Sequence, residues 1–248
     1  MIHKNDIFFS FYDINARGDV TLTALLQHIN LAAGANAEKL GIGTDVIIPL
    51  GITFVLQRFS VRIMQWAKFK QTATIRTWPA EITKGTFRRN GDLYDCNGTK
   101  IAEWTGLWVL IDVAERRVRR PKALPVTIPA HGLLDVQLEV KKFELPQNAV
   151  TLASYTHTVQ FSETDVNYHM NNAIYGNLIA NVVEKISQPA AENPKTQNAP
   201  TNWQQVHFNY LAEAKIGEQI LVECKQHQNT LYIIGTTAEH TVFTAEIC

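Results

Sequence analysis

The side chains best able to do chemistry gather in the sequence SETDVNYHMNN, which ends at Asn172. Asp165, Asn167 and His169 alternate along it, so an extended backbone would direct all three to one side. Asn171 and Asn172 follow at the expected start of a helix, where backbone N–H groups stabilise a developing negative charge. A carboxylate, an amide and an imidazole beside such donors are suited to attack on a carbonyl carbon.

The segments before this group predict one helix followed by a run of strands. Residues 19–40 carry apolar side chains at mixed spacings of three and four, and Asp19 or Thr21 can cap the first turn. The chain then becomes rich in Val, Ile, Thr, Phe and Trp, with a hairpin turn indicated at Asn97-Gly98. Strands are expected at 52–66, 71–82, 86–101 and 102–120. One helix followed by antiparallel strands is an α+β arrangement, with the sheet wrapped around the helix.

The second half repeats this order. A strand at 151–162 precedes a helix at 171–186, and a polar loop is expected at 187–202. Four more strands are expected at 203–214, 218–228, 230–238 and 240–248. A turn is indicated at Asn229-Thr230. We interpret the chain as an internal duplication of about 100–120 residues per copy.

Prolines between the two copies interrupt regular structure and indicate a connection there. We expect an N-terminal unit at 1–125, a linker at 126–150 and a C-terminal unit at 151–248. In an ungapped overlay, the positions of Asp165, Asn167, His169 and the later Glu213 are occupied in the first copy by Asn15, Arg17, Asp19 and Met64. The first copy therefore lacks the chemical group, and we expect one active site per chain, with much of the acyl-holding surface in the first half.

Composition excludes several classes of protein. The hydrophobic fraction is 46%, the charged fraction is 19% and the formal net charge is zero, which favours neither nucleic acid nor a membrane surface. Residues 1–124 hold 17 Lys and Arg against 11 Asp and Glu, and the remainder holds 6 against 12, so an acidic partner would meet the first half more readily. Three cysteines suit a reducing compartment, and the absence of a signal peptide or an apolar run of about 20 residues predicts a soluble cytoplasmic protein. No metal site or phosphate loop is evident, so no cofactor is expected.

The sequence resembles the plant-type and bacterial acyl-ACP thioesterases, which are tandem hotdog-fold proteins. The likeness covers nearly the whole chain and is carried by the helix TLTALLQHINLAAGANAEKLGIG, the strand WVLIDVAERRVRRPKALP and above all the motif TDVNYHMNN. It implies two α+β hotdog units and hydrolysis of the thioester of a fatty acyl-[acyl carrier protein], which releases a free fatty acid and ends chain elongation. The catalytic set that the family implies maps onto Asp165, Asn167, His169 and Glu213.

Within this set, Glu213 is expected to be the base that activates water, with mostly apolar neighbours that predict a buried carboxyl. Direct attack by Glu213 to form an anhydride is the other route. His169 either donates a hydrogen bond or shares the base role, Asn167 holds the water or orients Glu213, and Asp165 fixes the loop. Backbone N–H groups near Asn171 and Asn172 would form the oxyanion site. Many plant members carry Cys after the Glu, but this chain has Ala214, so a thiolate is not needed there.

Two surfaces are expected to serve the substrate. The acyl chain would lie against apolar residues of the first half, although the same residues equally suit a plain core: Leu22, Leu25, Leu26, Ile29, Trp66, Trp104 and Trp108. A basic cluster would dock the acidic acyl carrier protein, unless it is simply a solvated strand end; it consists of Arg116, Arg117, Arg119, Arg120 and Lys122, with Lys84, Arg88 and Arg89 near it.

Three other functions remain open on the same fold. They are an acyl-CoA thioesterase, a hotdog dehydratase that removes a carbon-bound proton, and a non-catalytic acyl-binding regulator. A regulator would usually carry a DNA-binding segment, and no helix-turn-helix pattern precedes the fold, so we rank it last. Tandem copies can pair their sheets within one chain, and a homodimer is a further expectation.

Overall fold

A computed structural model describes residues 2–140, 142–187 and 203–248 of the chain. The chain divides into two compact units, of which the first comprises Met1–Val20 and Ala24–Val140 and the second comprises Thr21–Thr23 and Lys141–Cys248. Of the polar loop expected at 187–202, residues 188–202 lie outside the described residues.

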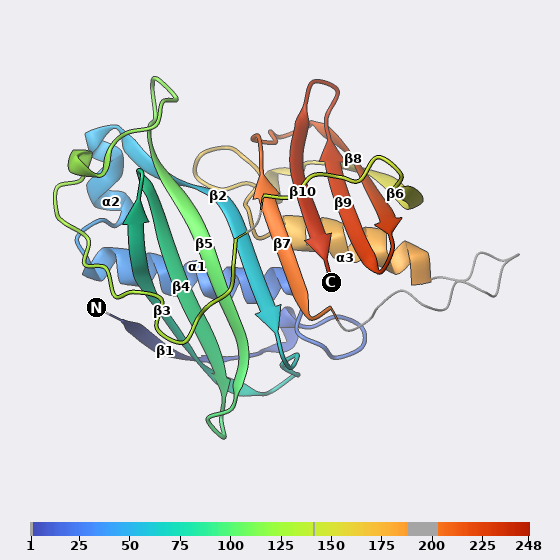
Figure 1. The fold of residues 1–248 in the computed structure, drawn as a ribbon, viewed down its shortest axis with the longest axis horizontal. Helices are drawn as coiled ribbons and strands as arrows, with labels where there is room; N and C mark the ends of the chain where they lie inside the picture. Colours follow the sequence, from blue (N-terminus) through green and yellow to red (C-terminus); the bar gives the residue numbers. More distant parts are fainter. Residues whose placement is uncertain (1, 141, 188–202) are drawn as a thin grey trace, which may run out of the picture. The chain divides into compact units, whose positions relative to one another are not determined.

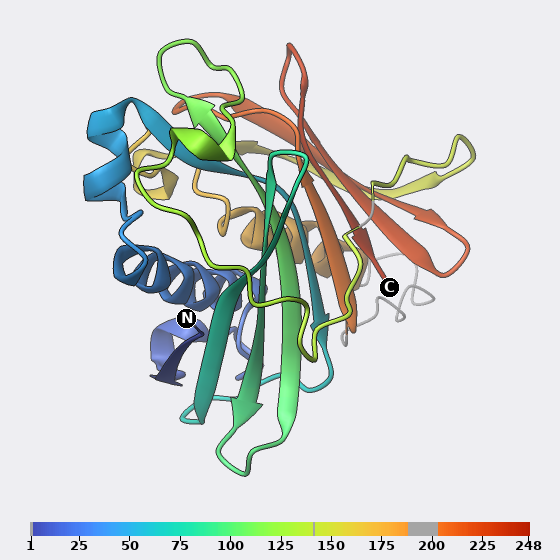
Figure 2. The same ribbon diagram turned by 60° about the vertical axis from the view of Figure 1, so that its left-hand side comes forward.

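The first unit is one antiparallel sheet crossed on one face by a long helix, as Figures 1 and 2 show. Its strands lie in the order β1-β3-β4-β5-β2, and every neighbouring pair is antiparallel. The strands are β1 (His3–Phe8), β2 (Ile52–Ile63), β3 (Thr72–Thr83), β4 (Thr86–Asp95) and β5 (Lys100–Asp112). The helices are η1 (Phe11–Asp13), α1 (Leu22–Lys39), α2 (Thr44–Ile47), η2 (Ile48–Leu50) and η3 (Pro121–Ala123). Strand β1 was not expected from the sequence.

The helix α1 forms where the sequence predicts it, because its apolar side chains recur at helical spacing. Leu25, Leu26 and Ile29 are buried, whereas Leu31 on another face is largely exposed. The helix ends at Lys39, and Gly41, two residues later, adopts the left-handed conformation with φ of 73°. The N–H groups of Gly41 and Ile42 donate to carbonyls of the last turn, and the buried Ile42 then directs the chain into the core.

The prediction of a strand over 102–120 is wrong beyond Asp112, where β5 ends. The Asp112 side chain accepts hydrogen bonds from the N–H groups of Ala114 and Glu115 at 3.0 and 2.9 Å. Such a local acceptor offers the backbone an alternative to the ladder and turns the chain. The basic residues that follow therefore lie in an exposed loop.

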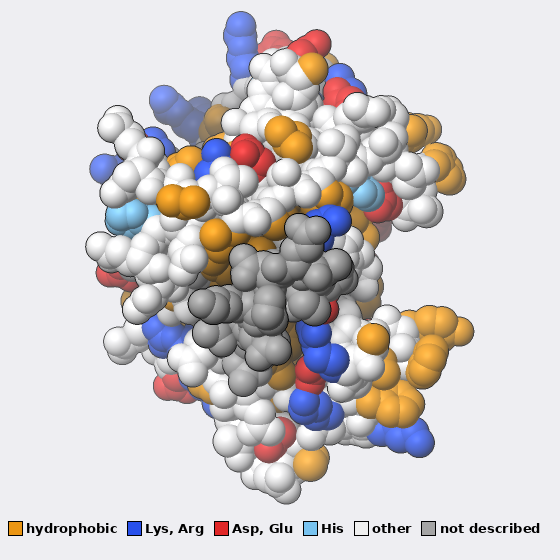
Figure 3. All heavy atoms as spheres, turned by 90° about the vertical axis from the view of Figure 1, so that its right-hand side faces the viewer, with side chains coloured by type: hydrophobic (Ala, Val, Ile, Leu, Met, Phe, Trp, Pro, Cys, Tyr) orange, Lys and Arg blue, Asp and Glu red, His pale blue; other side chains and the backbone are white. Residues whose placement is uncertain are grey.

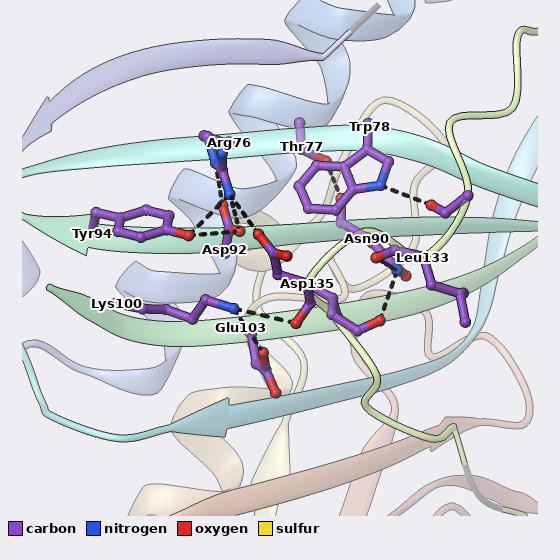
Figure 4. A network of polar contacts seen from close by, with 12 residues as sticks. Arg76, Thr77, Trp78, Asn90, Asp92, Tyr94, Lys100, Glu103, Leu133 and Asp135 are labelled. Carbon is purple, nitrogen blue, oxygen red and sulfur yellow. Dashed lines mark hydrogen bonds and ion pairs between the residues drawn. The ribbon is translucent and has the colours of Figure 1, made fainter. Parts of the chain in front are cut away.

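The linker expected at 126–150 begins too early, since the first unit extends to Val140. Val136 and Leu138 are fully buried against Trp78 and Ala80, which fastens residues 128–140 to the sheet. Side chains of three different strands also donate to carbonyls of this segment, as Figure 4 shows in part: Trp78 to Gly132 at 3.1 Å, Asn90 to Leu133 at 3.3 Å, and Lys100 to Asp135 at 3.3 Å. A proline-rich composition does not distinguish a free linker from a packed strap.

Beneath this segment lies a network of charged side chains (Figure 4). Arg76 donates to both carboxylate oxygens of Asp92, at 2.7 and 2.5 Å, and to the Tyr94 hydroxyl at 2.9 Å. Asp92 is fully buried. The guanidinium also lies 4.8 Å from the centre of the Tyr94 ring. A buried carboxylate is tolerated here because a two-pronged partner and a hydroxyl satisfy it.

The second unit repeats the layout with one helix on one antiparallel sheet. Its strands lie in the order β7-β10-β9-β8-β6. The elements are β6 (Val150–Thr158), η4 (Phe161–Glu163), α3 (Tyr175–Ser187), β7 (Gln205–Tyr210), β8 (Gln219–His227), β9 (Thr230–Thr236) and β10 (Thr241–Ile247). The buried side chains of α3 are Leu178, Ile179, Val182 and Val183. The helix packs on β6 and β8, where Ile220, Val222 and Cys224 alternate inward.

Candidate active site

The segment that carries Asp165, Asn167 and His169 is a tight turn and not an extended strand, so the predicted alternation is wrong. Asp165 N–H donates to the His169 carbonyl and Tyr168 N–H donates to the Asp165 carbonyl, each at 3.0 Å. Tyr168 has φ of 63°, in the left-handed region. The Asp165 Oδ1 atom accepts from Asn167 N–H at 2.8 Å, which folds the turn. The turn itself lies between flanking residues that pair with each other, Thr164 and Met170.

The turn brings His169 to Glu213 across 44 residues of sequence. His169 Nε2 lies 3.0 Å from Glu213 Oε2, and the two side chains are 19% and 34% exposed. The backbones also pair, because His169 forms a ladder pair with Lys215 and Met170 N–H donates to the Ala214 carbonyl at 2.8 Å. The imidazole–carboxylate contact is therefore supported by the backbone on both sides.

Glu213 is neither on a strand nor buried, which corrects two expectations. Strand β7 ends at Tyr210, and Glu213 lies in the segment between β7 and β8. Of its apolar neighbours, Leu211 and Ile216 are exposed and Ala214 alone is buried among the three. Apolar residue type did not predict burial because the segment runs along the surface. A carboxylate that is one-third exposed has direct access to solvent water, which is the nucleophile required in a hydrolysis.

Asn171 shapes the approach to the helix, whose first residue is Tyr175 and not Asn171. The Asn171 side chain accepts from Ala173 N–H at 2.9 Å, and its carbonyl accepts from Ile174 N–H at 2.9 Å. The Asn171 N–H donates to the Glu163 carbonyl at 2.9 Å. Asn171 thus closes the turn before the helix, and an oxyanion site formed by backbone N–H groups near Asn171 and Asn172 stays a proposal.

Two tyrosines of this region were missed by sequence reasoning. The Tyr210 hydroxyl donates to the Asn172 carbonyl at 3.1 Å. Tyr175 is 3% exposed. Its pKa is raised by burial first and then by the negative charges of Glu218 and Glu213. For Tyr210 the only sequence signal was an aromatic residue three positions before Glu213. Such a residue cannot be distinguished from an ordinary core residue by sequence.

The first unit contains the same turn with different side chains. Arg17 N–H donates to Asn15 Oδ1 at 2.8 Å, and Gly18 N–H donates to the Asn15 carbonyl at 2.9 Å. The carboxylate of Asp19 forms an ion pair with Lys68. The turn therefore forms without any imidazole. Of the two turns in the described residues, the one in the second unit brings a histidine to a glutamate.

The ladder register changes the first-unit counterpart of Glu213. Each turn is closed by a pair with a later lysine, Asp19 with Lys68 in the first unit and His169 with Lys215 in the second. Trp66 precedes its lysine by two residues, as Glu213 does. The ungapped overlay that placed Met64 there is wrong, because it is two residues out of register at this point.

Five of the seven expected acyl-holding residues of the first half are found in the core. Leu22, Leu25, Leu26, Ile29 and Trp104 are at most 4% exposed, whereas Trp66 and Trp108 are half-buried. The buried indole nitrogen of Trp104 has no hydrogen-bond partner. Their role in holding an acyl chain stays a proposal.

The basic residues after β5 are exposed, but they lie on a loop and not on the expected strand. Residues 113–120 are all exposed, and Arg119 lies 3.6 Å from Asp112. Arg88 instead donates to Thr105 and to the Leu138 carbonyl. Arg89 points to α1, where it donates to Asn36 at 2.8 Å, and burial lowers its pKa to about 10. Arg88 and Arg89 are therefore engaged in contacts within the unit, unlike the exposed basic residues of 113–120.

Neither a metal centre nor a membrane-spanning helix is found within the described ranges. No cluster of three or more His, Cys, Asp or Glu there could hold a metal ion. None of the helices in that part of the chain combines the length and the apolar character needed to cross a bilayer.

Comparison with known proteins identifies relatives of the chain. Residues 2–123 match the family model described as the acyl-ACP thioesterase N-terminal domain. An acyl-[acyl-carrier-protein] hydrolase of Cuphea viscosissima is 20% identical, and a palmitoyl-acyl carrier protein thioesterase of Arabidopsis thaliana is 21% identical, each over 187 residues. Each match covers 71% of this chain and 45% of the relative, so the chain spans less than half the length of these relatives.

Solved structures share the whole two-unit fold. An acyl-ACP thioesterase of Bacteroides thetaiotaomicron superposes with a TM-score of 0.79 at 19% identity and covers 99% of this chain and 96% of that chain. A 12:0-ACP thioesterase of Umbellularia californica gives a TM-score of 0.79 at 16% identity with the same coverage. These likenesses confirm the predicted α+β fold of two tandem hotdog units.

Proposed function

We propose, on the premise that the chain belongs to the acyl-ACP thioesterase family, that it hydrolyses the thioester of a fatty acyl-[acyl carrier protein] and releases the free fatty acid. The observation that carries the proposal is the 3.0 Å contact between His169 and Glu213 in the second unit. An imidazole that contacts a solvent-accessible carboxylate can activate water at a carbonyl that is already electrophilic.

In the proposed mechanism, Glu213 accepts a proton from water while the water oxygen bonds to the thioester carbonyl carbon. The oxyanion of the tetrahedral intermediate is stabilised by backbone N–H donors near Asn172, ahead of α3. The carbon–sulfur bond then breaks, and the proton held by the His169–Glu213 pair passes to the leaving thiolate. Asn167 orients the water from the turn, and Asp165 holds the turn through Asn167 N–H.

The decisive experiment measures hydrolysis of acyl-ACPs of graded chain length by the wild type, Glu213→Gln and His169→Asn. We expect kcat to fall by about 10²–10⁴-fold in both variants. The matched control is His157→Asn, because His157 Nε2 lies 2.8 Å from Glu163 Oε2 and both are 19% exposed. This control removes the same kind of pair and leaves both His169 and Glu213 in place, so kcat should change by less than about threefold. Equal losses in all three variants would contradict the assignment.

The anhydride route differs in one measurable atom. If Glu213 attacked the carbonyl itself, hydrolysis in oxygen-18 water would label the enzyme carboxylate in a single turnover. We favour the general base because Glu213 is open to solvent and contacts an imidazole. Unlabelled Glu213 after one turnover is the expected result.

The basic loop, which we define as Arg116, Arg117, Arg119, Arg120 and Lys122, is the proposed docking surface for the carrier protein. On the face drawn in Figure 3, acidic and basic side chains are interspersed, so a local cluster must supply any attraction to an acidic partner. Charge reversal at Arg116, Arg117 and Arg119 should raise KM for acyl-ACP but not for a short acyl thioester. The control is reversal of Lys142, which is exposed outside the cluster. The effect should shrink at high salt, and equal effects on both substrates would eliminate docking here.

The other functions make distinct predictions. A preference for acyl-CoA over matched acyl-ACP would identify the CoA thioesterase, and conversion of a 3-hydroxyacyl thioester to the enoyl form would identify the dehydratase. We further propose that the second half supplies the catalytic groups and that the first half holds much of the acyl chain. Full activity of residues 151–248 alone would contradict this division. Cytoplasmic location and a homodimer are also proposals, to be tested by cell fractionation and by sedimentation.

A further inference from the structure

The segment that leads into α3 and the segment that carries Glu213 run antiparallel, and side-chain contacts join them at both ends. At one end His169 Nε2 meets Glu213 Oε2 at 3.0 Å. At the other end the Tyr210 hydroxyl donates to the Asn172 carbonyl at 3.1 Å. We call residues 169–172 and 210–213 together the helix-start frame. The two contacts are three positions apart on each segment, with two residues between them, so a shift at one end is passed to the other.

Tyr210 is held rigidly at its end of the frame. Its backbone pairs with Phe243 of β10, and Leu211 N–H donates to the Val242 carbonyl at 2.9 Å. Its ring stacks on Phe208 at 5.6 Å between centroids and 2° between planes, and it meets the Tyr175 ring edge-on at 5.6 Å. An aromatic ring fixed on two sides leaves its hydroxyl little freedom.

The hydrogen bond from Tyr210 also fixes one particular peptide plane. The Asn172 carbonyl and the Ala173 N–H belong to the same planar peptide unit. Tyr210 binds the carbonyl side, and Asn171 Oδ1 accepts from the N–H side at 2.9 Å. This peptide is therefore held from both sides, immediately between His169 and the first turn of α3. Its orientation sets the direction of the chain on both flanks.

We propose that Tyr210 is a positioning residue, whose hydroxyl sets the placement of the helix start relative to the His169–Glu213 pair. The inference rests on the proposed hydrolysis for its kinetic consequence, but not for its structural one. Burial raises the pKa of the Tyr210 hydroxyl far above its ordinary value, so this donor stays protonated throughout the pH range of an assay.

The test is Tyr210→Phe, with Tyr155→Phe as a matched control. The Tyr155 hydroxyl donates to the Leu178 carbonyl of α3 at 3.2 Å, so both variants delete one tyrosine bond to a backbone carbonyl and keep the ring. We expect similar small decreases in Tm for the two variants. Only Tyr210→Phe should lower kcat, by about tenfold or more, with KM within about twofold, because misplacement affects the transition state more than binding.

A second readout does not depend on turnover. The imidazole ¹⁵N signals of His169, assigned by their loss in His169→Asn, should shift in Tyr210→Phe and stay unchanged in Tyr155→Phe. If the wild type hydrolyses no thioester, the proposed function fails while this measurement still decides the positioning role. Unchanged His169 signals in Tyr210→Phe, or equal kinetic effects of the two variants, would overturn the inference.

Discussion

The sharpest single test of the site concerns Asp165, whose carboxylate faces the turn and not the Glu213 pair. Its Oδ1 atom accepts from Asn167 N–H at 2.8 Å. An amide oxygen can accept the same bond, and the first unit shows it, since Asn15 Oδ1 accepts from Arg17 N–H at 2.8 Å. We therefore expect Asp165→Asn to keep the turn and Asp165→Ala to lose it.

The expected size follows from the bond that is deleted. Loss of a side-chain acceptor of this kind costs about 1 kcal/mol, within a range of about 0.5–2. If that free energy is needed to hold the turn in the transition state, kcat falls about fivefold in Asp165→Ala. In Asp165→Asn the acceptor remains, so kcat should stay within about twofold of the wild type. A carboxylate that took or gave a proton would instead lose about 10²-fold or more on conversion to an amide.

The assay is kcat at saturating acyl-ACP for the wild type and both variants, with Tm recorded in parallel. The reasoning is refuted if Asp165→Asn is as slow as Asp165→Ala, because the two differ in the acceptor and not in the missing charge. Such a result would place Asp165 among the reacting groups. We expect Tm to decrease in Asp165→Ala and not in Asp165→Asn, because only the alanine variant loses the turn.

Two further predictions concern the first unit. Asp92→Asn should lower the free energy of unfolding by about 3 kcal/mol in urea titrations, because it removes the fully buried carboxylate that pairs with Arg76. The control is Glu81→Gln, which loses a half-exposed ion pair with Arg88 and should change the free energy of unfolding by less than about 1 kcal/mol. Equal losses in the two variants would show that burial of the pair does not matter. The pKa of His3 is lowered from 6.5 by burial first and then by neighbouring cations, so the folded state binds the proton more weakly than the unfolded chain. The contribution of His3 to stability is therefore full above pH 6.5 and is lost as the pH falls below it. The urea midpoints at about pH 7.5 and about pH 5.5 should differ less in His3→Asn than in the wild type. An unchanged difference between the two midpoints would rule out this contribution.

Much of the secondary structure was predictable because it depends on short-range patterns. The periodicity of residues 19–40 predicted α1, and the β-branched and aromatic runs predicted strands β2 to β5 in the right order. Strand β1 was missed because His3–Phe8 is mainly polar and becomes a strand by pairing with β3. The end of β5 was misplaced because a single side chain, Asp112, redirects the backbone.

The candidate site was predictable in residue type and not in geometry. The motif around His169 lies in the segment that contacts Glu213, but alternation along the chain suggested a strand where Asp165 makes a turn. The apolar neighbours of Glu213 suggested burial, yet the segment lies at the surface. Neither Tyr210 nor the strap at 128–140 could be inferred, because their partners are distant in sequence.

The sequence alone determined the two helix-and-sheet copies, the difference in side chains between them and the family resemblance, since these depend on local periodicity and on one motif. Only the tertiary structure decided that His169 meets Glu213 at 3.0 Å and that Tyr210 holds the peptide after Asn172. These contacts depend on strand register and on a turn set by one carboxylate, and both arise only when distant segments pack together.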